Sequence, residues 1–352
     1  MWTVASAAAV AVLAALVSPG SARENPAPAR ANPCDRFAAP DGNDRNRGTL
    51  RSPFATPNRL IRSLRPGQTG CLRHGSYAAD DEPVLAIDRG GRPGEPIRIR
   101  SFPGERARLV GIVHLRAGAD HVVLSRLTIE GVGDQNTIKI YAADVVIERN
   151  DITNAWRGQS CMMLGSNDGP GGAVRTIVRG NRFHECGDPD NDNKDHSIYA
   201  ANLSGGKIVD NLFWNHTGRA IQLYPNADRN LVAHNVIDGG SPSVRGGVVI
   251  GSDGGDTSSG NVIEHNIIAY STEWNLYTNW NDDKGSDNVA RRNCFWAGGA
   301  GNIETDDGGL TAHDNMIANP QLRSRAQRDY RLHPASKCLK VVGYDTAARL
   351  RR

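Results

Sequence analysis

A short pattern that ends in asparagine recurs through the middle and end of this 352-residue sequence. Each copy has β-branched or apolar residues, a polar pair ending in Asn, and then one or two apolar residues. The asparagines are Asn150, Asn181, Asn211, Asn235, Asn266, Asn293 and Asn315, and neighbours are separated by 22 to 31 residues. An earlier copy, HVVLSRLTI at 121–129, lacks the asparagine. One such repeat cannot bury its own apolar row, so the copies are expected to stack on one another.

A second short strand is expected between the copies. The segments are HSIYAA (196–201), RAIQLY (219–224), GGVVIG (246–251), NLYTN (275–279) and NIETD (302–306). Short alternating strands at this spacing, with Gly and Asn at the corners, predict a parallel β-helix of about ten coils. The repeated asparagines are interpreted as a ladder at a turn, since Asn tolerates left-handed backbone and its amide can bond the next coil.

A capping helix is predicted at the start of the solenoid, within TPNRLIRSLRPG at 56–67. Thr56 is a suitable N-cap residue and Pro57 suits the first helical position. Leu60, Ile61 and Leu64 would then lie on one face. A solenoid needs such a cap to cover the open end of its core.

The segment APDGNDRNRGTLRSPFATPNRLIRSLRPGQTGCLRHGSY at 39–77, with the repeats that follow, resembles the pectate-lyase-like right-handed parallel β-helix superfamily. The resemblance covers about residues 39–340 and implies an all-β, single-stranded right-handed β-helix with a short N-terminal capping helix. The superfamily includes polysaccharide lyases, glycoside hydrolases, epimerases and non-catalytic surface proteins. The calcium-binding aspartates and catalytic arginine of pectate lyases do not match residue by residue, so the resemblance implies a fold rather than a specific activity.

The chain is expected to be a secreted monomer. Residues 1–22 contain the apolar run Val4–Val17 and are predicted to be a signal peptide. Residues 23–38 are predicted as a linker, 39–344 as the β-helix domain and 345–352 as a basic tail. No later segment is apolar enough for a membrane span, and a net charge of +3 is too small to indicate nucleic-acid binding.

Six cysteines without a CxxC pair indicate disulfides in an exported protein. Their spacing favours Cys34–Cys71, Cys161–Cys186 and Cys294–Cys338, although other pairings stay open.

Aligning the second strands predicts two rows of outward side chains. One row is Tyr199, Gln222, Ile250, Tyr277 and Glu304, and the other is Ala201, Tyr224, Ser252, Asn279 and Asp306. Adjacent coils lie about 4.8 Å apart, so a saccharide chain could contact several of them.

The leading hypothesis is a lyase that acts on a uronate glycan by β-elimination. Arg219 or Lys194 would neutralise the uronate carboxylate, which makes the C5 proton more acidic. His196 or Tyr199 would take that proton, and Tyr199 or Tyr224 would protonate the leaving oxygen. The predicted substrate-binding residues are Gln222, Tyr224, Trp274, Tyr277, Trp280, Asp282, Asp283 and Glu304.

Two alternatives stay open. One is a glycoside hydrolase in which Asp282 or Asp283 acts with Glu304 or Asp306 as a pair of carboxylates. The other is a carbohydrate-binding or surface β-helix protein without catalysis.

The alternating acids Asp188, Asp190 and Asp192 resemble the start of an EF-hand loop. The positions where that loop needs Gly and Glu are occupied by Asn193 and Tyr199, so the EF-hand interpretation fails. A looser calcium site made of these three aspartates and nearby carbonyls is left as an alternative.

Overall fold

The computed structural model describes residues 1–2, 33–79, 82–167, 169, 171–191, 195–240, 244–281 and 283–350. All but the first two residues of the predicted signal peptide lie outside the described residues, as do Asp192, Lys194 and Asp282. By its internal contacts the chain separates into two units, Met1–Pro33 and Cys34–Arg352. The second unit contains every strand and helix below. No helix among the described residues has the length and apolar character that crossing a membrane requires.

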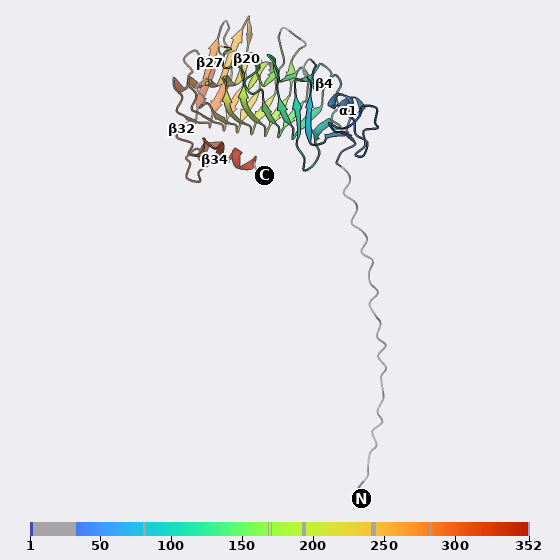
Figure 1. Ribbon diagram of the computed structural model, residues 1–352. Helices are drawn as coiled ribbons and strands as arrows, with labels where there is room; N and C mark the ends of the chain where they lie inside the picture. Colours follow the sequence, from blue (N-terminus) through green and yellow to red (C-terminus); the bar gives the residue numbers. More distant parts are fainter. Residues whose placement is uncertain are drawn as a thin grey trace. The chain divides into compact units, whose positions relative to one another are not determined.

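Three parallel sheets run along the second unit, and each coil of the chain contributes one strand to each sheet (Figure 1). Sheet 1 consists of β1 (Arg36–Ala38), β2 (Thr69–Leu72), β5 (Ile97–Ser101), β8 (Val122–Ser125), β11 (Val146–Glu148), β15 (Ile177–Arg179), β18 (Lys207–Val209), β21 (Leu231–Ala233), β25 (Val262–Glu264), β28 (Asn288–Arg291) and β31 (Leu310–His313). Sheet 2 consists of β3 (Gly75–Ala78), β6 (Ala107–Val110), β9 (Thr128–Glu130), β12 (Asp151–Thr153), β16 (Arg182–Cys186), β19 (Leu212–His216), β22 (Val236–Asp238), β26 (Ile267–Ala269), β29 (Cys294–Trp296) and β32 (Met316–Ile317).

Sheet 3 carries the longest strands. It consists of β4 (Leu85–Ile87), β7 (Val113–Leu115), β10 (Ile138–Ile140), β13 (Met162–Leu164), β17 (Ile198–Ser204), β20 (Gly218–Asp228), β23 (Val244–Asp253), β27 (Trp274–Trp280) and β30 (Gly301–Ile303). Two short strands join its edge, β14 (Ala173–Val174) beside β17 and β24 (Asp256–Thr257) antiparallel to β23. The described strands form nine complete coils with partial coils at both ends, slightly fewer than the ten predicted. The predicted parallel β-helix is confirmed.

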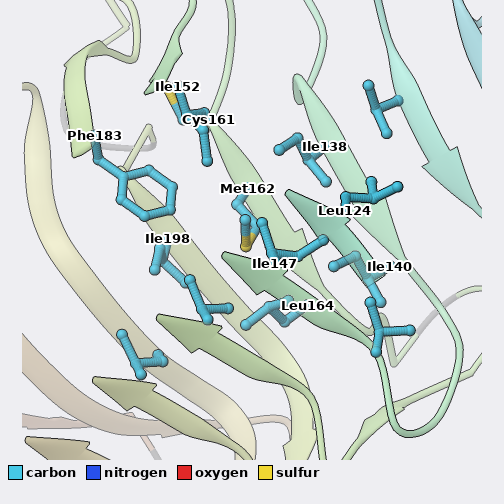
Figure 2. Close-up of a cluster of buried hydrophobic side chains, with 14 of the residues drawn as sticks. Leu124, Ile138, Ile140, Ile147, Ile152, Cys161, Met162, Leu164, Phe183 and Ile198 are labelled. Atoms are coloured by element: carbon cyan, nitrogen blue, oxygen red, sulfur yellow. The ribbon is translucent and has the colours of Figure 1, made fainter. Parts of the chain in front are cut away.

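The core is the apolar row that points inward from all three sheets. Figure 2 shows Leu124 and Ile147 from sheet 1 facing Ile138, Ile140 and Met162 from sheet 3. All five side chains are fully buried. Burying one such side chain contributes about 1.5–3 kcal/mol, so successive coils stabilise one another through this row.

The asparagine ladder is confirmed at the corner between sheets 1 and 2, but the left-handed backbone belongs to the residue before each asparagine, such as Arg149 (φ 55°) and Asp210 (φ 59°), and not to the asparagine itself. Asn181 is typical: its Nδ2 donates to the carbonyl of Ile147 (2.9 Å) and to Oδ1 of Asn211 (3.0 Å). Oδ1 of Asn211 also accepts the backbone N–H of Asn181 (2.9 Å). The same pattern runs from Asn150 to Asn315. The ladder therefore satisfies buried backbone groups at a bend where no strand can pair them.

A second ladder, which we did not predict, joins Asn230, Asn261 and Asn288 between sheets 3 and 1.

The predicted cap and disulfides are also confirmed. Helix α1 (Pro57–Ser63) begins after Thr56, whose side chain accepts the backbone N–H of Arg59 (3.1 Å). Leu60, Ile61 and Leu64 are buried against the first coils. The three disulfides join Cys34 to Cys71, Cys161 to Cys186 and Cys294 to Cys338.

The last part of the chain packs back onto the coils. It contains β33 (Leu322–Ser324), β34 (Asp329–Leu332), α2 (Leu339–Val342) and α3 (Thr346–Arg349). The ring of Tyr344 stacks on His234 with centroids 4.1 Å apart, and Thr346 donates to the carbonyl of His234. Helix α3 falls within the segment predicted as a basic tail, and Ala347 in it is buried.

Candidate functional site

A pocket of about 400 Å³ opens on the outward face of sheet 3. It is lined by His196, Tyr199, Arg219, Gln222, Tyr224, Val249 and Asn279. These residues come from β17, β20, β23 and β27, together with the residues that lead into β17. The structure thus brings together five residues predicted from the sequence, three as catalytic and two as substrate-binding.

The register of the strands sets which side chains reach this pocket. Tyr199 pairs with Gln222, Gln222 with Val249, and Val249 with Tyr277. The prediction that Ile250 and Ser252 point outward is wrong, because Ile250 is buried in the core and Ser252 is also buried. The run Val248–Val249–Ile250 has no polar residue to mark a face, and a slip of one residue exchanges the two faces of a strand.

His196 is buried beneath the pocket, with 2% of its surface exposed. Its Nδ1 accepts the backbone N–H of Arg219 (3.2 Å), which assigns the ring proton to Nε2. Gly218 permits this approach: it has φ +55°, and a Cβ there would lie 2.8 Å from Nδ1. Burial lowers the pKa of His196 to about 3, and the nearby Arg219 and His216 act in the same direction. The neutral Nε2–H tautomer is a hydrogen-bond donor, which favours Tyr199 over His196 as a base.

The guanidinium of Arg219 is oriented by two neighbours. Its Nε donates to the Tyr277 hydroxyl, and its Nη2 lies 4.0 Å from a carboxylate oxygen of Glu273. Gly246, directly opposite on β23, has no side chain to separate Arg219 from Tyr277. Burial raises the pKa of Tyr277, while the charge of Arg219 opposes that rise. Arg219 is therefore a positioned cation beside the pocket.

Tyr224 forms the far wall of the pocket. Its hydroxyl accepts a hydrogen bond from Nδ2 of Asn281 (2.8 Å), and its ring lies over Gly251. A Cβ on Gly251 would come within 2.5 Å of that ring, so the glycine makes room for the tyrosine.

The other predicted aromatic residues pack against the coils. Trp280 donates from Nε1 to the carbonyl of Gly308 (2.9 Å) and is partly buried against the core. The ring of Trp274 covers Gly301, and Tyr277 is only 8% exposed. These contacts leave the three rings little open face on which a sugar could stack.

Two described acids of the hydrolase alternative lie in exposed loops. Asp283 and Asp306 are exposed. Glu304 binds its own loop, with Oε1 accepting the N–H of Asp306 (2.5 Å) and of Asp307 (3.3 Å).

The calcium alternative gains no support from the described aspartates. Oδ1 of Asp188 accepts the backbone N–H of Asp190 (2.9 Å), which is a local turn rather than a cluster of ligands. No group of three or more His, Cys, Asp or Glu among the described residues could hold an ion.

Asp195 is a buried carboxyl that the sequence reasoning missed, directly before His196. It is 3% exposed, and its Oδ2 accepts from Nδ2 of Asn191 (2.9 Å) and from the backbone N–H of Asp188 (3.1 Å). Burial raises its pKa. The loop around it is rich in polar residues, so nothing in the sequence distinguished this one as buried.

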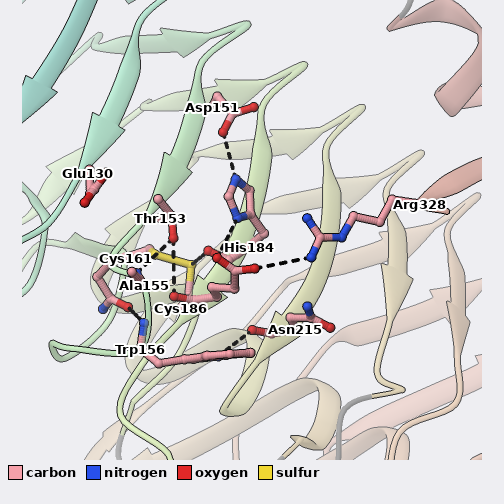
Figure 3. A network of polar contacts seen from close by, with 12 residues as sticks. Glu130, Asp151, Thr153, Ala155, Trp156, Cys161, His184, Cys186, Asn215 and Arg328 are labelled. Carbon is pink, nitrogen blue, oxygen red and sulfur yellow. Dashed lines mark hydrogen bonds and ion pairs between the residues drawn. A yellow bond between two sulfur atoms is a disulfide. The ribbon is translucent and has the colours of Figure 1, made fainter. Parts of the chain in front are cut away.

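A separate polar network covers the outer face of sheet 2 (Figure 3). The Nε2 of His184 lies 2.7 Å from Oδ1 of Asp151, and its ring stacks on Trp214. Arg328 from the C-terminal segment reaches Glu185 (3.3 Å). His184 was not predicted as a functional residue. Its Nδ1 lies 3.6 Å from Oε2 of Glu185, so the ring is held between two carboxylates.

Comparisons with known proteins agree with the fold. The family model described as right handed beta helix region matches residues 110–272. A structure titled "Glycoside hydrolase" is 11% identical with a TM-score of 0.58, over 86% of this chain and 99% of that one. The pectate lyase Pel9A is 12% identical with a TM-score of 0.51, over 86% of this chain and 90% of that one.

A third solved structure is the GH136 lacto-N-biosidase of Eubacterium ramulus, 12% identical with a TM-score of 0.52. It matches over 80% of this chain and 67% of its own. A search of curated protein sequences gave no match. At these identities the likeness concerns the fold.

Proposed function

We propose that this right-handed parallel β-helix protein is a secreted lyase acting on a uronate-containing polysaccharide. The observation that carries the proposal is the sheet 3 pocket, which gathers a cation, two tyrosines and a neutral histidine from adjacent coils. Neighbours of the same fold include a pectate lyase and glycoside hydrolases, which is in keeping with a carbohydrate substrate.

Arg219 binds the uronate carboxylate in this proposal. Its contact with Tyr277 holds the guanidinium in place before the substrate arrives, so little reorganisation is needed. Neutralising the carboxylate stabilises the negative charge that develops when the C5 proton leaves.

Tyr199, as its phenolate, takes the C5 proton and becomes the phenol, because His196 already uses Nδ1 to accept the Arg219 backbone N–H. The C5–H electron pair forms the C4–C5 double bond, and the C4–O4 bond breaks with its electrons on oxygen. That oxygen takes a proton from Tyr224, or from Tyr199 itself. His196 packs beside Tyr199, with ring centroids 5.7 Å apart, and orients it in this proposal.

The test is to incubate the protein with polyuronates and with neutral polysaccharides, and to follow two signals. A lyase produces an unsaturated uronate, which absorbs in the ultraviolet, only from the polyuronates. New reducing ends without that absorbance would replace this proposal with hydrolysis. Binding without any cleavage would replace it with a non-catalytic carbohydrate-binding protein.

Secretion is part of the same proposal. Three disulfides suit an oxidising compartment, and the apolar segment near the start of the chain suits a signal peptide. Detecting the mature chain outside the cell, with its N-terminus after Ala22, would test this point.

A further inference from the structure

A second pocket, of about 790 Å³, lies away from the sheet 3 pocket. It follows the corner between sheets 1 and 2 and extends to the C-terminal residues Arg349 and Leu350. Its lining holds seven arginines against three carboxylates, a formal excess of four positive charges, and contains no lysine. We call this pocket the arginine groove.

The carboxylates of the arginine groove are already engaged. Glu105 pairs with Arg73 (2.7 Å), which lies outside the groove, and Glu148 pairs with Arg179 (2.6 Å). Asp210 accepts a hydrogen bond from Tyr344.

Six lining arginines make no ion pair with a described carboxylate: Arg100, Arg106, Arg126, Arg149, Arg182 and Arg349. Burial and the nearby charge of Arg126 lower the pKa of Arg100, which is the effect expected where cations crowd together. The lining therefore carries more positive charge than its three carboxylates balance.

The arrangement of these charges follows the coil repeat. Arg126 and Arg149 occupy the same left-handed corner position on successive coils, with φ of 58° and 55°. The next coil has Gly180 in that position, with φ 65°. A Cβ on Gly180 would approach Leu350 to 3.3 Å, so the glycine opens the floor of the groove. The two corner positions that carry a cation thus lie about 4.8 Å apart along the solenoid.

We propose that the arginine groove is a second, non-catalytic binding site for a carboxylated segment of an acidic polysaccharide. An extended polymer with repeating anions can reach guanidinium groups on neighbouring coils of the groove. Guanidinium groups suit carboxylates because they donate two parallel hydrogen bonds. The choice of a uronate polymer rests on the proposed function, whereas the capacity to bind anions does not.

A nucleic acid fits the arginine groove less well. Single strands are held largely by bases that stack on aromatic rings. Phe102 is the aromatic residue that lines the groove, and it packs beside Phe37 (5.9 Å) beneath the guanidinium of Arg73 (5.1 Å). Its ring is therefore already covered.

The test measures binding of a polyuronate oligosaccharide to the full chain by calorimetry, in a Tyr199→Phe background that prevents cleavage. The double variant Arg126→Gln/Arg149→Gln should weaken the arginine-groove site about tenfold. The matched control is Arg292→Gln, since Arg292 is exposed in the same corner position (φ 54°) but does not line the groove. This control should stay within about twofold, and added salt should weaken the site.

Unchanged affinity and number of sites in the double variant would overturn the proposal. Polyphosphate or single-stranded DNA that bound through these arginines more tightly than polyuronate would overturn the choice of ligand. Failure of the lyase proposal is distinguishable: the double variant would still remove one class of sites, although no unsaturated product formed in the unmutated protein.

Discussion

The outward face of sheet 3 and the corner between sheets 1 and 2 belong to the same coils, yet they differ in regularity. At the corner, one asparagine per coil repeats the same hydrogen bonds from Asn150 to Asn315. Along sheet 3, the pairing shifts register between Ala200 and Asn202 and again between Gly218 and Arg219. Among the described parallel pairs, these two shifts are the ones recorded, and both adjoin the pocket.

The corner and the pocket therefore have different structural requirements. The corner must look the same on every coil, because each asparagine accepts from one neighbour and donates to the next. The pocket needs different side chains on adjacent coils, so its strands depart from the repeat. Four changes to the chain or to its conditions would probe this difference between the corner and the pocket.

Replacing one ladder asparagine should cause the largest loss of stability. Asn211→Leu removes the acceptor for both the N–H and Nδ2 of Asn181 and the donor to the Val178 carbonyl. Each unsatisfied buried group costs about 1–3 kcal/mol, so we expect a loss of about 3–6 kcal/mol in urea unfolding. The same change at exposed Asn279 in the pocket should cost less than about 1 kcal/mol. Equal losses at the two sites would remove the distinction between corner and pocket.

Replacing the proposed base should cause the largest loss of activity. Tyr199→Phe keeps the ring but removes the hydroxyl, so turnover should fall about 10²–10⁴-fold with little change in KM or stability. Steady-state rates of unsaturated product formation measure this. Tyr141→Phe, on the same sheet but outside the pocket lining, should stay within about twofold. Full activity of Tyr199→Phe would show that the pocket does not act in this way.

Acid should weaken the pocket region before it affects the uncharged ladder. Burial lowers the pKa of His196 to about 3 and that of His216 to about 4, from a usual value of 6.5. The unfolded chain binds these two protons below about pH 6.5 and the folded chain does not, so this stability is present above that pH and lost as pH falls. At about pH 4.5 each histidine should lower the free energy of unfolding by about 2.6 kcal/mol.

Urea unfolding near pH 7.5 and near pH 4.5 measures this loss, and His216→Gln should remove about half of the histidine contribution. An identical pH dependence in the variant would contradict the assignment.

The smallest effect should come from the wall of the pocket. Asn281→Ala removes the donor to the Tyr224 hydroxyl and should raise KM about twofold to fivefold without changing kcat. A fall in kcat of the same size as for Tyr199→Phe would indicate that Tyr224, rather than Tyr199, carries the proton transfer.

The asparagine corner and the apolar core could be predicted from the sequence because they repeat on successive coils. The asparagines, the apolar rows and the cap starting at Thr56 each depend on nearby residues, and their periodicity is visible in one chain. The sheet 3 pocket could be predicted only in part. His196, Tyr199 and Arg219 were placed near one another, but the run Val248–Val249–Ile250 gave no register for β23.

The features that the sequence did not predict depend on contacts between coils. The tautomer of His196 depends on the backbone of Arg219, which follows Gly218 one coil later. Trp280 is predicted from the sequence to bind substrate, but its ring packs over glycines of later segments, including Gly309. The arginine groove combines residues from five coils with the C-terminal segment, and no local sequence pattern indicates such a combination.

The central claim is that the sheet 3 pocket cleaves a uronate polymer by β-elimination. The most direct measurement is the mass of the oligosaccharides released from a polyuronate by the intact protein, with Tyr199→Phe in parallel. If elimination takes place in the sheet 3 pocket, the unmutated protein forms fragments whose new end is one water lighter than that of a hydrolysis product. Such fragments are nearly absent with Tyr199→Phe. Fragments that all contain the added water, or unsaturated fragments formed equally by both proteins, would contradict it.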